Sequence, residues 1–445
     1  MNPAMEKEDT LHQSQFVSFL KKKGTGPTMS KNLSSEELHQ VTTLFRSPRV
    51  HLTTKATLIS AFLTLQNSSE ETVWLETVIR NPNSILPSEL IPLLPNQTSN
   101  HPFVLLIKNV FTHHDLNEKE CEEALRYFFD TDTPEYLKAA FLEAERLKRE
   151  TELENRMFYD ALWEKSRHGL AGLPVLIDLS NAYDGFNRTP YFTVFTAALL
   201  GSIGFPCVLH GSEDVGPKYG VTAFKVLKEA GKNPLRSIEN TLSDLENPLI
   251  AWAYCDQRLS FPELDAIRTL RKNMVKRPIL ATLEKLLQPI RSPRGNYVVM
   301  GYTHPPYKGL LISLLKHQNR CPRFLILRGV EGSIQAALDR RTPFVNFNEN
   351  AIEEGFIRPS DFQIPESALM FNHELITKDS LQLGLKALRG EKSPVLDSII
   401  YQARIILHCF QLLSPDEAAF QVKHSIDSGK AYQHWERGME NTFIM

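Results

Sequence analysis

The first 80 residues carry hydrophobic positions at the spacing of amphipathic helices. Ser34 and Glu37 have the spacing of a capping box, in which each side chain satisfies a backbone amide of the other residue. Apolar residues then recur every three or four positions, at Leu38, Val41, Leu44 and Phe45. Residues 57–65 are apolar on most faces, which is typical of a central bundle helix. The pattern predicts a small helical N-terminal domain over residues 1–80.

Residues 81–170 show a different pattern. Five prolines lie between Pro82 and Pro102, which is too dense for a helix or a central strand. A helix start at Thr133–Pro134 precedes a long charged stretch that reaches Trp163, with acidic and basic residues four positions apart. We interpret residues 81–170 as a Pro-rich linker and a long, solvated connector helix.

Short apolar runs alternate with helical segments over residues 171–445. The runs are residues 174–179, 205–210, 248–254, 297–302, 323–329 and 343–347. Because continuous apolar strands separated by helices are typical of buried parallel sheets, we expect a mainly parallel central sheet. The longest predicted intervening helix covers residues 262–288, and a capping box at Ser414–Glu417 starts another near the C-terminus. The predicted fold class is α/β, with a small helical N-terminal domain and a large α/β domain.

The charge of the chain is nearly balanced overall but not locally. The formal net charge is −2, whereas residues 266–328 contain thirteen Lys or Arg and one acidic residue, Glu284. A segment this basic requires anions, which can be acidic neighbours in the fold, a phosphate ligand or a nucleic acid.

The five cysteines are far apart in the sequence, so they form no CxxC metal or redox motif. No run of about 18 apolar residues occurs, which argues against a membrane span. Several cysteines lie in apolar runs, as buried thiols do in a reducing compartment. We therefore expect a soluble, cytoplasmic protein without membrane contact.

Two loops follow predicted strands and carry groups that suit an anion. Residues 180–190 contain Asp184, Gly185 and Arg188 before a helix, although the local sequence alone favours a plain turn. Residues 210–220 contain His210, three glycines and Lys218, also before a helix. A Gly-rich loop is weak evidence by itself.

A basic stripe is predicted on the helix that begins after Ser260. Its members fall on one helical face and are Arg268, Arg271, Lys272 and Lys276. Such a stripe is usually a solvated face, but few acidic residues accompany it. A ligand role is the alternative interpretation.

Several segments, in order, resemble anthranilate phosphoribosyltransferase and its relatives in glycosyltransferase family 3. DLSNAYDG at 178–185 lies where the family has its diphosphate loop, GTGGDG. FPCVLHGSEDVGPKYG at 205–220 resembles the KHGNR…SSKSG segment. RKNMVKRPILATLEKLLQP at 271–289 resembles RKELGIRTIFNILGPLLNP. The chain looks like a divergent branch of this family.

The resemblance implies a transferase that moves phosphoribosyl from phosphoribosyl diphosphate, with Mg²⁺, to an aromatic or nitrogenous acceptor, as in tryptophan biosynthesis. It also implies a homodimer. The implied diphosphate-binding residues are Asp184, Gly185, Asn187, Arg188, Thr189, His210, Gly211, Lys218 and Gly220. The implied acceptor-binding residues are Arg271 and Arg277, and no catalytic residue is implied.

The chain also departs from the family pattern. Bulky residues replace the loop glycines, Leu209 replaces a lysine, and Glu213 replaces an arginine. The acidic pair that would hold Mg²⁺ reads Ile334–Gln335, which leaves Glu331 as the nearby carboxylate and makes Mg²⁺ doubtful. If the protein still uses a phosphate-bearing ligand, we expect Lys218 and Arg271 to converge on it, and Glu213 to point away from it or to pair with a neighbouring Arg or Lys. The alternative function is a catalytically degenerate relative that is regulatory or binds nucleic acid through residues 266–328.

Overall fold

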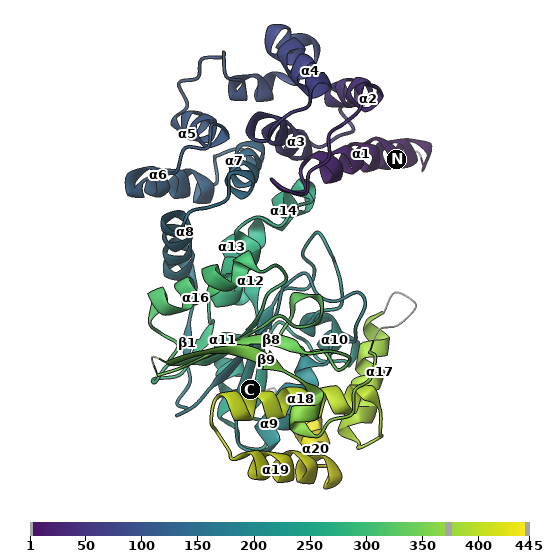
Figure 1. The fold of residues 1–445 in the computed structure, drawn as a ribbon, viewed down its shortest axis with the longest axis vertical. Helices are drawn as coiled ribbons and strands as arrows, with labels where there is room; N and C mark the ends of the chain where they lie inside the picture. Colours follow the sequence, from purple (N-terminus) through teal and green to yellow (C-terminus); the bar gives the residue numbers. More distant parts are fainter. Residues whose placement is uncertain (1–2, 350, 370–375, 441–445) are drawn as a thin grey trace. The chain divides into compact units, whose positions relative to one another are not determined.

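The computed structural model describes residues 3–349, 351–369 and 376–440, and the chain divides into two compact units (Figure 1). The helical unit comprises Met1–Ala161 and Ala266–Leu280. The α/β unit comprises Leu162–Asp265 and Ala281–Met445. The chain therefore enters the α/β unit, returns once to the helical unit and leaves it again.

The helical unit is built around α3, whose residues are almost all buried. Its helices are α1 (Pro3–Lys23), α2 (Ser35–Arg46), α3 (Leu52–Thr64), α4 (Ser69–Arg80), α5 (Pro102–Phe111), α6 (Glu118–Phe129), α7 (Glu135–Lys148), the start of α8 (Glu152–Lys165) and α14 (Arg268–Met274). The capping boxes predicted at Ser34–Glu37 and Ser68–Glu71 are present. α14 packs against α3 and α7, so the returning segment forms part of this core.

Residues 81–161 are not a linker, because they form η1 (Pro82–Ser84), η2 (Ser88–Leu93), α5–α7 and most of α8 inside the helical unit. The single connector helix predicted from Thr133–Pro134 to Trp163 is also wrong. α7 ends where Arg149 adopts a left-handed φ of 75°, and Thr151 and Glu154 cap the start of α8 reciprocally. α7 is buried along most of its length, because α3 and α5 pack against it.

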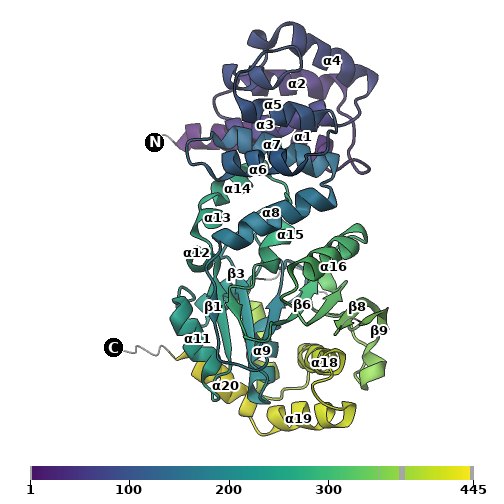
Figure 2. The same ribbon diagram turned by 90° about the vertical axis from the view of Figure 1, so that its left-hand side faces the viewer.

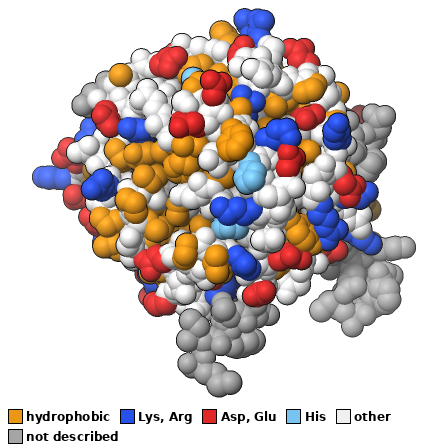
Figure 3. All heavy atoms as spheres, turned by 90° about the horizontal axis from the view of Figure 1, so that it is seen from below, with side chains coloured by type: hydrophobic (Ala, Val, Ile, Leu, Met, Phe, Trp, Pro, Cys, Tyr) orange, Lys and Arg blue, Asp and Glu red, His pale blue; other side chains and the backbone are white. Residues whose placement is uncertain are grey.

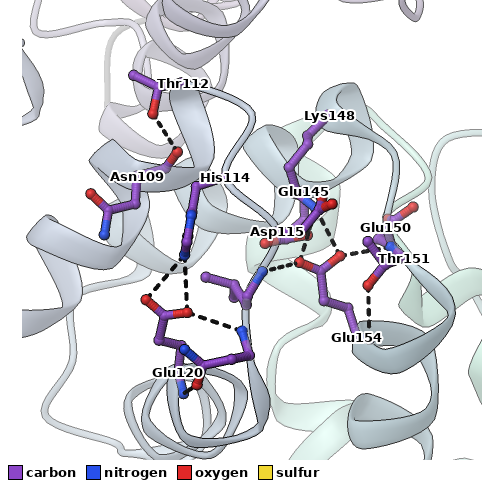
Figure 4. A network of polar contacts seen from close by, with 12 residues as sticks. Asn109, Thr112, His114, Asp115, Glu120, Glu145, Lys148, Glu150, Thr151 and Glu154 are labelled. Atoms are coloured by element: carbon purple, nitrogen blue, oxygen red, sulfur yellow. Dashed lines mark hydrogen bonds and ion pairs between the residues drawn. The ribbon is translucent and has the colours of Figure 1, made fainter.

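A network of polar groups joins α7 to α8 (Figure 4). Lys148, at the end of α7, contacts Glu154 at 2.7 Å, Asp115 at 3.1 Å and Glu145 at 3.5 Å. Glu154 also accepts a hydrogen bond from the amide of Leu116 at 2.7 Å. The network fixes the turn between the two helices and the start of α6.

The α/β unit contains a seven-stranded sheet in the order β4-β3-β2-β6-β7-β8-β9, of which Figure 2 labels β3, β6, β8 and β9. The strands are β2 (Ile177–Ser180), β3 (Cys207–Gly211), β4 (Trp252–Asp256), β6 (Tyr297–Gly301), β7 (Arg323–Leu327), β8 (Thr342–Asn348) and β9 (Ala351–Ile357). The strands β4, β3, β2, β6 and β7 run parallel to one another. β8 pairs antiparallel with β7, and β9 pairs antiparallel with β8. β1 (Gly169–Leu170) and β5 (Ile290–Arg291) form a separate parallel pair.

Helices cover both faces of this sheet. The helices and 3-10 turns of the unit are α9 (Thr193–Ser202), α10 (Ala223–Glu229), α11 (Ile238–Glu246), α12 (Gln257–Ser260), α13 (Pro262–Ala266), α15 (Leu280–Leu283), η3 (Glu284–Leu286), α16 (Pro306–Gln318), η4 (Val330–Gly332), η5 (Pro359–Phe362), α17 (Thr377–Leu388), α18 (Pro394–Cys409), α19 (Pro415–Asp427) and α20 (Lys430–Met439). Leu209 and Trp252 face the large core beneath α9, α10 and α17–α20, whereas Val208 and Ala253 face a smaller core beneath α11. On the face toward α19 and α20, hydrophobic side chains gather in one area with charged ones around them (Figure 3).

All six predicted strands are present, and the α/β class with a mainly parallel sheet is confirmed. The predicted helix 262–288 is wrong as one element. It is divided into α13, α14, α15 and η3, and α14 ends where Val275 adopts a left-handed φ of 58°. No helix among the described residues is long and apolar enough to cross a membrane.

The order of the strands locates the edge where a ligand is expected. The chain passes from β2 to β3 and β4, and then to β6 on the other side of β2. In open α/β sheets, ligands bind outside the carboxyl ends of the strands where the direction of winding reverses. Here that position lies at the ends of β2 and β6, where the loops after β2, β3 and β7 also meet.

Candidate functional site

The loops after β2, β3 and β7 meet at an anion-binding arrangement that we call the anion cradle. It consists of the backbone amides of Asn187, Arg188 and Thr189, the Thr189 hydroxyl and the Lys218 amine. These groups surround the carboxylate of Glu331. Lys218 Nζ lies 2.7 Å from Glu331 Oε2, and the Arg188 and Thr189 amides donate to Oε1 at 2.8 and 3.0 Å. The Thr189 hydroxyl donates at 3.0 Å and the Asn187 amide at 3.2 Å.

The environment of Glu331 favours its charged form. Burial raises the pKa of the Glu331 carboxyl. The contacts with Lys218 and with the amides of Arg188 and Asn187 lower this pKa by more than burial raises it. The net result is a pKa below the ordinary value. The cradle therefore holds a carboxylate anion at neutral pH.

Two glycines allow the first two loops to lie against each other. Phe186 and Val221 exchange two backbone hydrogen bonds, at 2.9 and 2.8 Å. A Cβ atom at Gly185, which has a φ of +76°, would lie 2.6 Å from the Val221 carbonyl oxygen. A Cβ atom at Gly220 would lie 2.5 Å from Asn187 Oδ1. Both glycines were predicted as diphosphate contacts, and their space is taken by the neighbouring loop.

A buried chain of side chains lies beside the cradle. His210 Nε2 lies 3.0 Å from Asp178 Oδ1, and His210 Nδ1 lies 2.5 Å from the Tyr183 hydroxyl. A carboxylate only accepts hydrogen bonds, so Nε2 carries a proton toward Asp178. Burial raises the pKa of Tyr183 well above its ordinary value, and Glu284 and Asp178 act in the same direction. This chain joins β2, its loop and β3 from inside.

Long polar side chains occupy the end of β6. Lys285 Nζ donates to the Gly301 carbonyl oxygen at 2.9 Å, and Gln257 Nε2 donates to Glu284 Oε2 at 3.3 Å. Burial lowers the pKa of Lys285 to about 8, although Glu284 and Asp184 raise it. In the segment that resembles the family, Glu284 and Lys285 stand where RKELGIRTIFNILGPLLNP has Gly-Pro. Asp184, predicted as a diphosphate contact, is a buried neighbour of this lysine.

Neutral groups stand where an acidic pair would hold a metal ion. Gln335 Oε1 accepts from the Phe192 amide at 3.1 Å, and its Nε2 donates to the Pro190 carbonyl oxygen at 3.1 Å. Ile334 is fully buried in the large core. Within the described part of the chain, no group of three or more His, Cys, Asp or Glu side chains is arranged to hold a metal ion. With Glu331 already bound by the cradle, the residues present do not fit a protein-held Mg²⁺.

A cavity of about 140 Å³ opens beside the cradle. Its polar lining includes Arg188, Glu331 and Arg340, and its apolar lining includes Phe192 and Leu338. Arg188 is exposed, whereas Thr189 is buried. The cavity thus places the Glu331 carboxylate within reach of a small molecule.

The two arginines predicted to bind an acceptor belong to the helical unit. Arg271 lies on α14 and is only 2% exposed, so it is part of the helical core, while Arg277 is exposed. The predicted basic stripe is interrupted, because α14 ends at Met274 and Lys276 lies beyond the left-handed Val275. The residues predicted to bind diphosphate all lie in the α/β unit.

The basic segment 266–328 is shared between the two units, so it does not form one helix face. Several of its members pair or are buried: Lys308 contacts Glu354 at 2.5 Å and Arg323 contacts Glu349 at 3.0 Å. Acidic neighbours in the fold therefore account for part of the segment, as one of the sequence alternatives proposed.

Of the two arrangements expected for Glu213, the structure shows the ion-paired one. Its carboxylate pairs with Lys228 at 2.9 Å and with Arg258 at 3.3 Å. Leu209, at the other position where a cation was lost, is fully buried in the large core. Neither residue contributes to the cradle.

Lys218 and residues 187–189, which the sequence predicted as diphosphate contacts, lie together around Glu331, whose own role was not predicted. The resemblance suggested a metal ligand, whereas the structure shows a carboxylate bound by amides and a lysine. Lys285 was also missed, although a signal was available: with Glu284 it interrupts the otherwise mainly apolar stretch 279–287, and charged residues are rarely buried in such stretches.

No family model matches the chain. It is 27% identical to an uncharacterized protein of Aquifex aeolicus over 298 residues, which cover 66% of this chain and 87% of the relative. It is 25% identical to an anthranilate phosphoribosyltransferase of Syntrophomonas wolfei over 331 residues, 74% of this chain and 94% of the relative.

Solved structures show the same fold. The anthranilate phosphoribosyltransferase of Thermus thermophilus superposes with a TM-score of 0.62 at 18% identity, covering 75% of this chain and 98% of that one. The Saccharomyces cerevisiae enzyme in complex with PRPP and Mg gives a TM-score of 0.62 at 16% identity, with 76% and 96% covered. In sequence, the chain is thus distantly similar to anthranilate phosphoribosyltransferases, and it shares their fold.

Proposed function

We propose that the α/β unit binds a phosphate-bearing small molecule of the phosphoribosyl diphosphate class and that the protein is a phosphoribosyltransferase with an aromatic or nitrogenous acceptor. The observation that carries the proposal is the anion cradle at the carboxyl end of the sheet. Three backbone amides, a hydroxyl and a lysine converge on one anionic position there. The relatives named as phosphoribosyltransferases support the same class of ligand.

The cradle would act by position and charge. Backbone amides aimed at one point need no reorganisation when an oxyanion arrives, and Lys218 adds a full positive charge. Transfer of the sugar to an acceptor would then depend mainly on holding the two molecules in a reactive geometry. The buried Asp178–His210–Tyr183 chain would support this geometry by fixing the loop after β2.

Calorimetry with phosphoribosyl diphosphate, with and without Mg²⁺, tests the proposal. Lys218→Ala removes a charge-assisted contact, so binding should weaken by about 1.5–3 kcal/mol, roughly tenfold to a hundredfold. The matched control is Lys228→Ala, because Lys228 is an exposed lysine that pairs with Glu213. Absence of binding to the parent protein at millimolar ligand, or equal binding by Lys218→Ala, would remove the support for a transferase.

A second candidate function, nucleic-acid binding, is favoured by a basic–aromatic cluster in the α/β unit. Its members are Trp163, His168, Arg291 and Arg320. The guanidinium carbons of Arg320 and Arg291 lie 4.1 and 5.4 Å from the centre of a Trp163 ring, which is stacked on His168. Two arginines that lie near the same aromatic ring are suited to phosphate backbones.

A mobility-shift titration over salt concentration tests this candidate. Binding through phosphate contacts should weaken steeply as salt increases, and Arg291→Ala with Arg320→Ala should reduce the salt slope by about two. If no complex forms at low salt, the nucleic-acid function is excluded.

A further inference from the structure

We propose that Glu331 is the resident anion of the cradle and that a phosphate-bearing ligand, entering from the adjoining cavity, binds by displacing its carboxylate. The inference rests on the proposed phosphate site and adds how that site is kept closed. Glu331 would then determine both the affinity and the charge of the ligands that the site accepts.

The contacts of Glu331 are those of a bound oxyanion. Its two oxygens take up all five groups of the cradle, from residues 187–189 and Lys218. Successive backbone amides and a lysine are the groups that phosphate oxygens also use. A ligand oxyanion and the Glu331 carboxylate therefore compete for the same donors.

The backbone holds Glu331 in a conformation that needs support. Glu331 has a left-handed φ of 53°, which is uncommon for a residue with a Cβ atom. Such conformations cost of order 1–3 kcal/mol and persist where the surroundings impose them. Next to it, Gly332 has a φ of 78°. Backbone hydrogen bonds from Gly332 to Gly329 and from Ser333 to Val330 also hold this turn, so the cradle contacts are one of several supports.

The cavity gives the incoming ligand a route to the cradle, and the charges around it determine which anions are preferred. Glu331 lines the cavity together with Arg188 and Arg340. While Glu331 neutralises Lys218, the cradle attracts anions weakly. Asp339 also lines the cavity and pairs with Arg340 at 2.9 Å. Once the Glu331 carboxylate leaves, Lys218 in the cradle and the exposed Arg188 beside it supply the positive charge that favours a multiply charged phosphate over a carboxylate.

Calorimetry with inorganic diphosphate on the full-length chain tests the inference. The variants are Glu331→Gln and Glu331→Ala, with Lys218→Ala for the site itself. Glu349→Gln is the control, because Glu349 is an exposed carboxylate that pairs with Arg323. Loss of the competing charge should tighten diphosphate binding about tenfold in both Glu331 variants, while Lys218→Ala weakens it and Glu349→Gln leaves it unchanged. Thermal unfolding of each variant shows which proteins are folded.

The outcomes separate this inference from the proposed function. Tighter binding by the Glu331 variants supports it, even if the parent protein binds too weakly to detect. If Lys218→Ala weakens binding but the Glu331 variants bind equally or less well than the parent, the phosphate site stands and the inference is overturned. If neither the parent nor the Glu331 variants bind diphosphate, both are overturned.

Discussion

Lys285 is a lysine buried among the loops at the end of β6, and its protonation is coupled to folding. Burial lowers the pKa of Lys285 to about 8 from an ordinary value of 10.5. Between these values the unfolded chain holds a proton that the folded chain lacks, so stability rises with pH over this interval. Below pH 8 the folded protein carries the cost of a buried charge.

Lys285→Met should therefore reduce the rise in stability between about pH 8 and 10 and leave stability at neutral pH equal or higher. Urea unfolding at several pH values measures both. Lys228→Met, which changes an exposed lysine, should have no such effect. A loss of stability at neutral pH would show that the bond from Nζ to the Gly301 carbonyl outweighs the cost of burial.

Among the single residues of the site, those that attract an anion were predictable from the sequence. Lys218 and the loop 187–189 follow strands and precede helices, which is where phosphates bind. The role of Glu331 was not predictable, because its partners come from loops more than a hundred positions away in the sequence. The same holds for Gly185 and Gly220, whose need for glycine arises from contact between two loops.

At the scale of elements, the junction of α7 and α8 depends on one cation. The Lys148 side chain is 2% exposed and contacts Glu154, Glu145 and Asp115. Removing one partner of a buried ion pair leaves the other charge uncompensated.

Lys148→Ala should therefore lower the free energy of unfolding by about 3–5 kcal/mol. Burial and nearby Glu154 raise the pKa of Glu145 well above its ordinary value, so Glu145→Gln, which introduces a neutral side chain, should cost far less. Denaturant unfolding of both variants measures the difference. Equal losses would mean that the network does not depend on the charge of Lys148.

The elements themselves were predicted to different extents. The parallel strands are buried on both faces, so their sequences are continuous apolar runs that identify them. β9 was missed because it is an edge strand with mostly exposed positions, including Glu353 and Glu354. The charged stretch at α7 and α8 was predicted as solvated, whereas Lys148 pairs with Glu145 and Glu154 in the interior.

At the scale of the whole molecule, the helical unit is discontinuous in sequence. α14 comes from residues 266–280 and contributes Leu270 and Met274 to the core of this unit. Its Asn273 carbonyl accepts a hydrogen bond from Thr54 at 2.8 Å. The family resemblance concerned ordered motifs and did not indicate this return of the chain.

A fragment of residues 1–161 should consequently unfold at a lower temperature than the helical unit does in the full chain. A synthetic peptide of residues 266–280 should bind the fragment and raise its melting temperature, because it restores the packing of α14. Circular dichroism with increasing peptide measures this. A peptide in which Leu270 and Met274 are replaced by Asp is the control and should have no effect.

Because the helical unit is discontinuous in sequence, its two parts are synthesised at different times. When residue 161 has been added, the surface of α3 and α7 that receives α14 is complete but uncovered. The covering segment follows only after β2, β3 and β4 have been translated. At about 5–20 residues per second, the wait until residue 280 is roughly 6–24 s. During that interval the nascent chain exposes the apolar surface of α3 and α7. A chaperone would therefore find more apolar surface to bind on the ribosome-bound chain than on the completed protein.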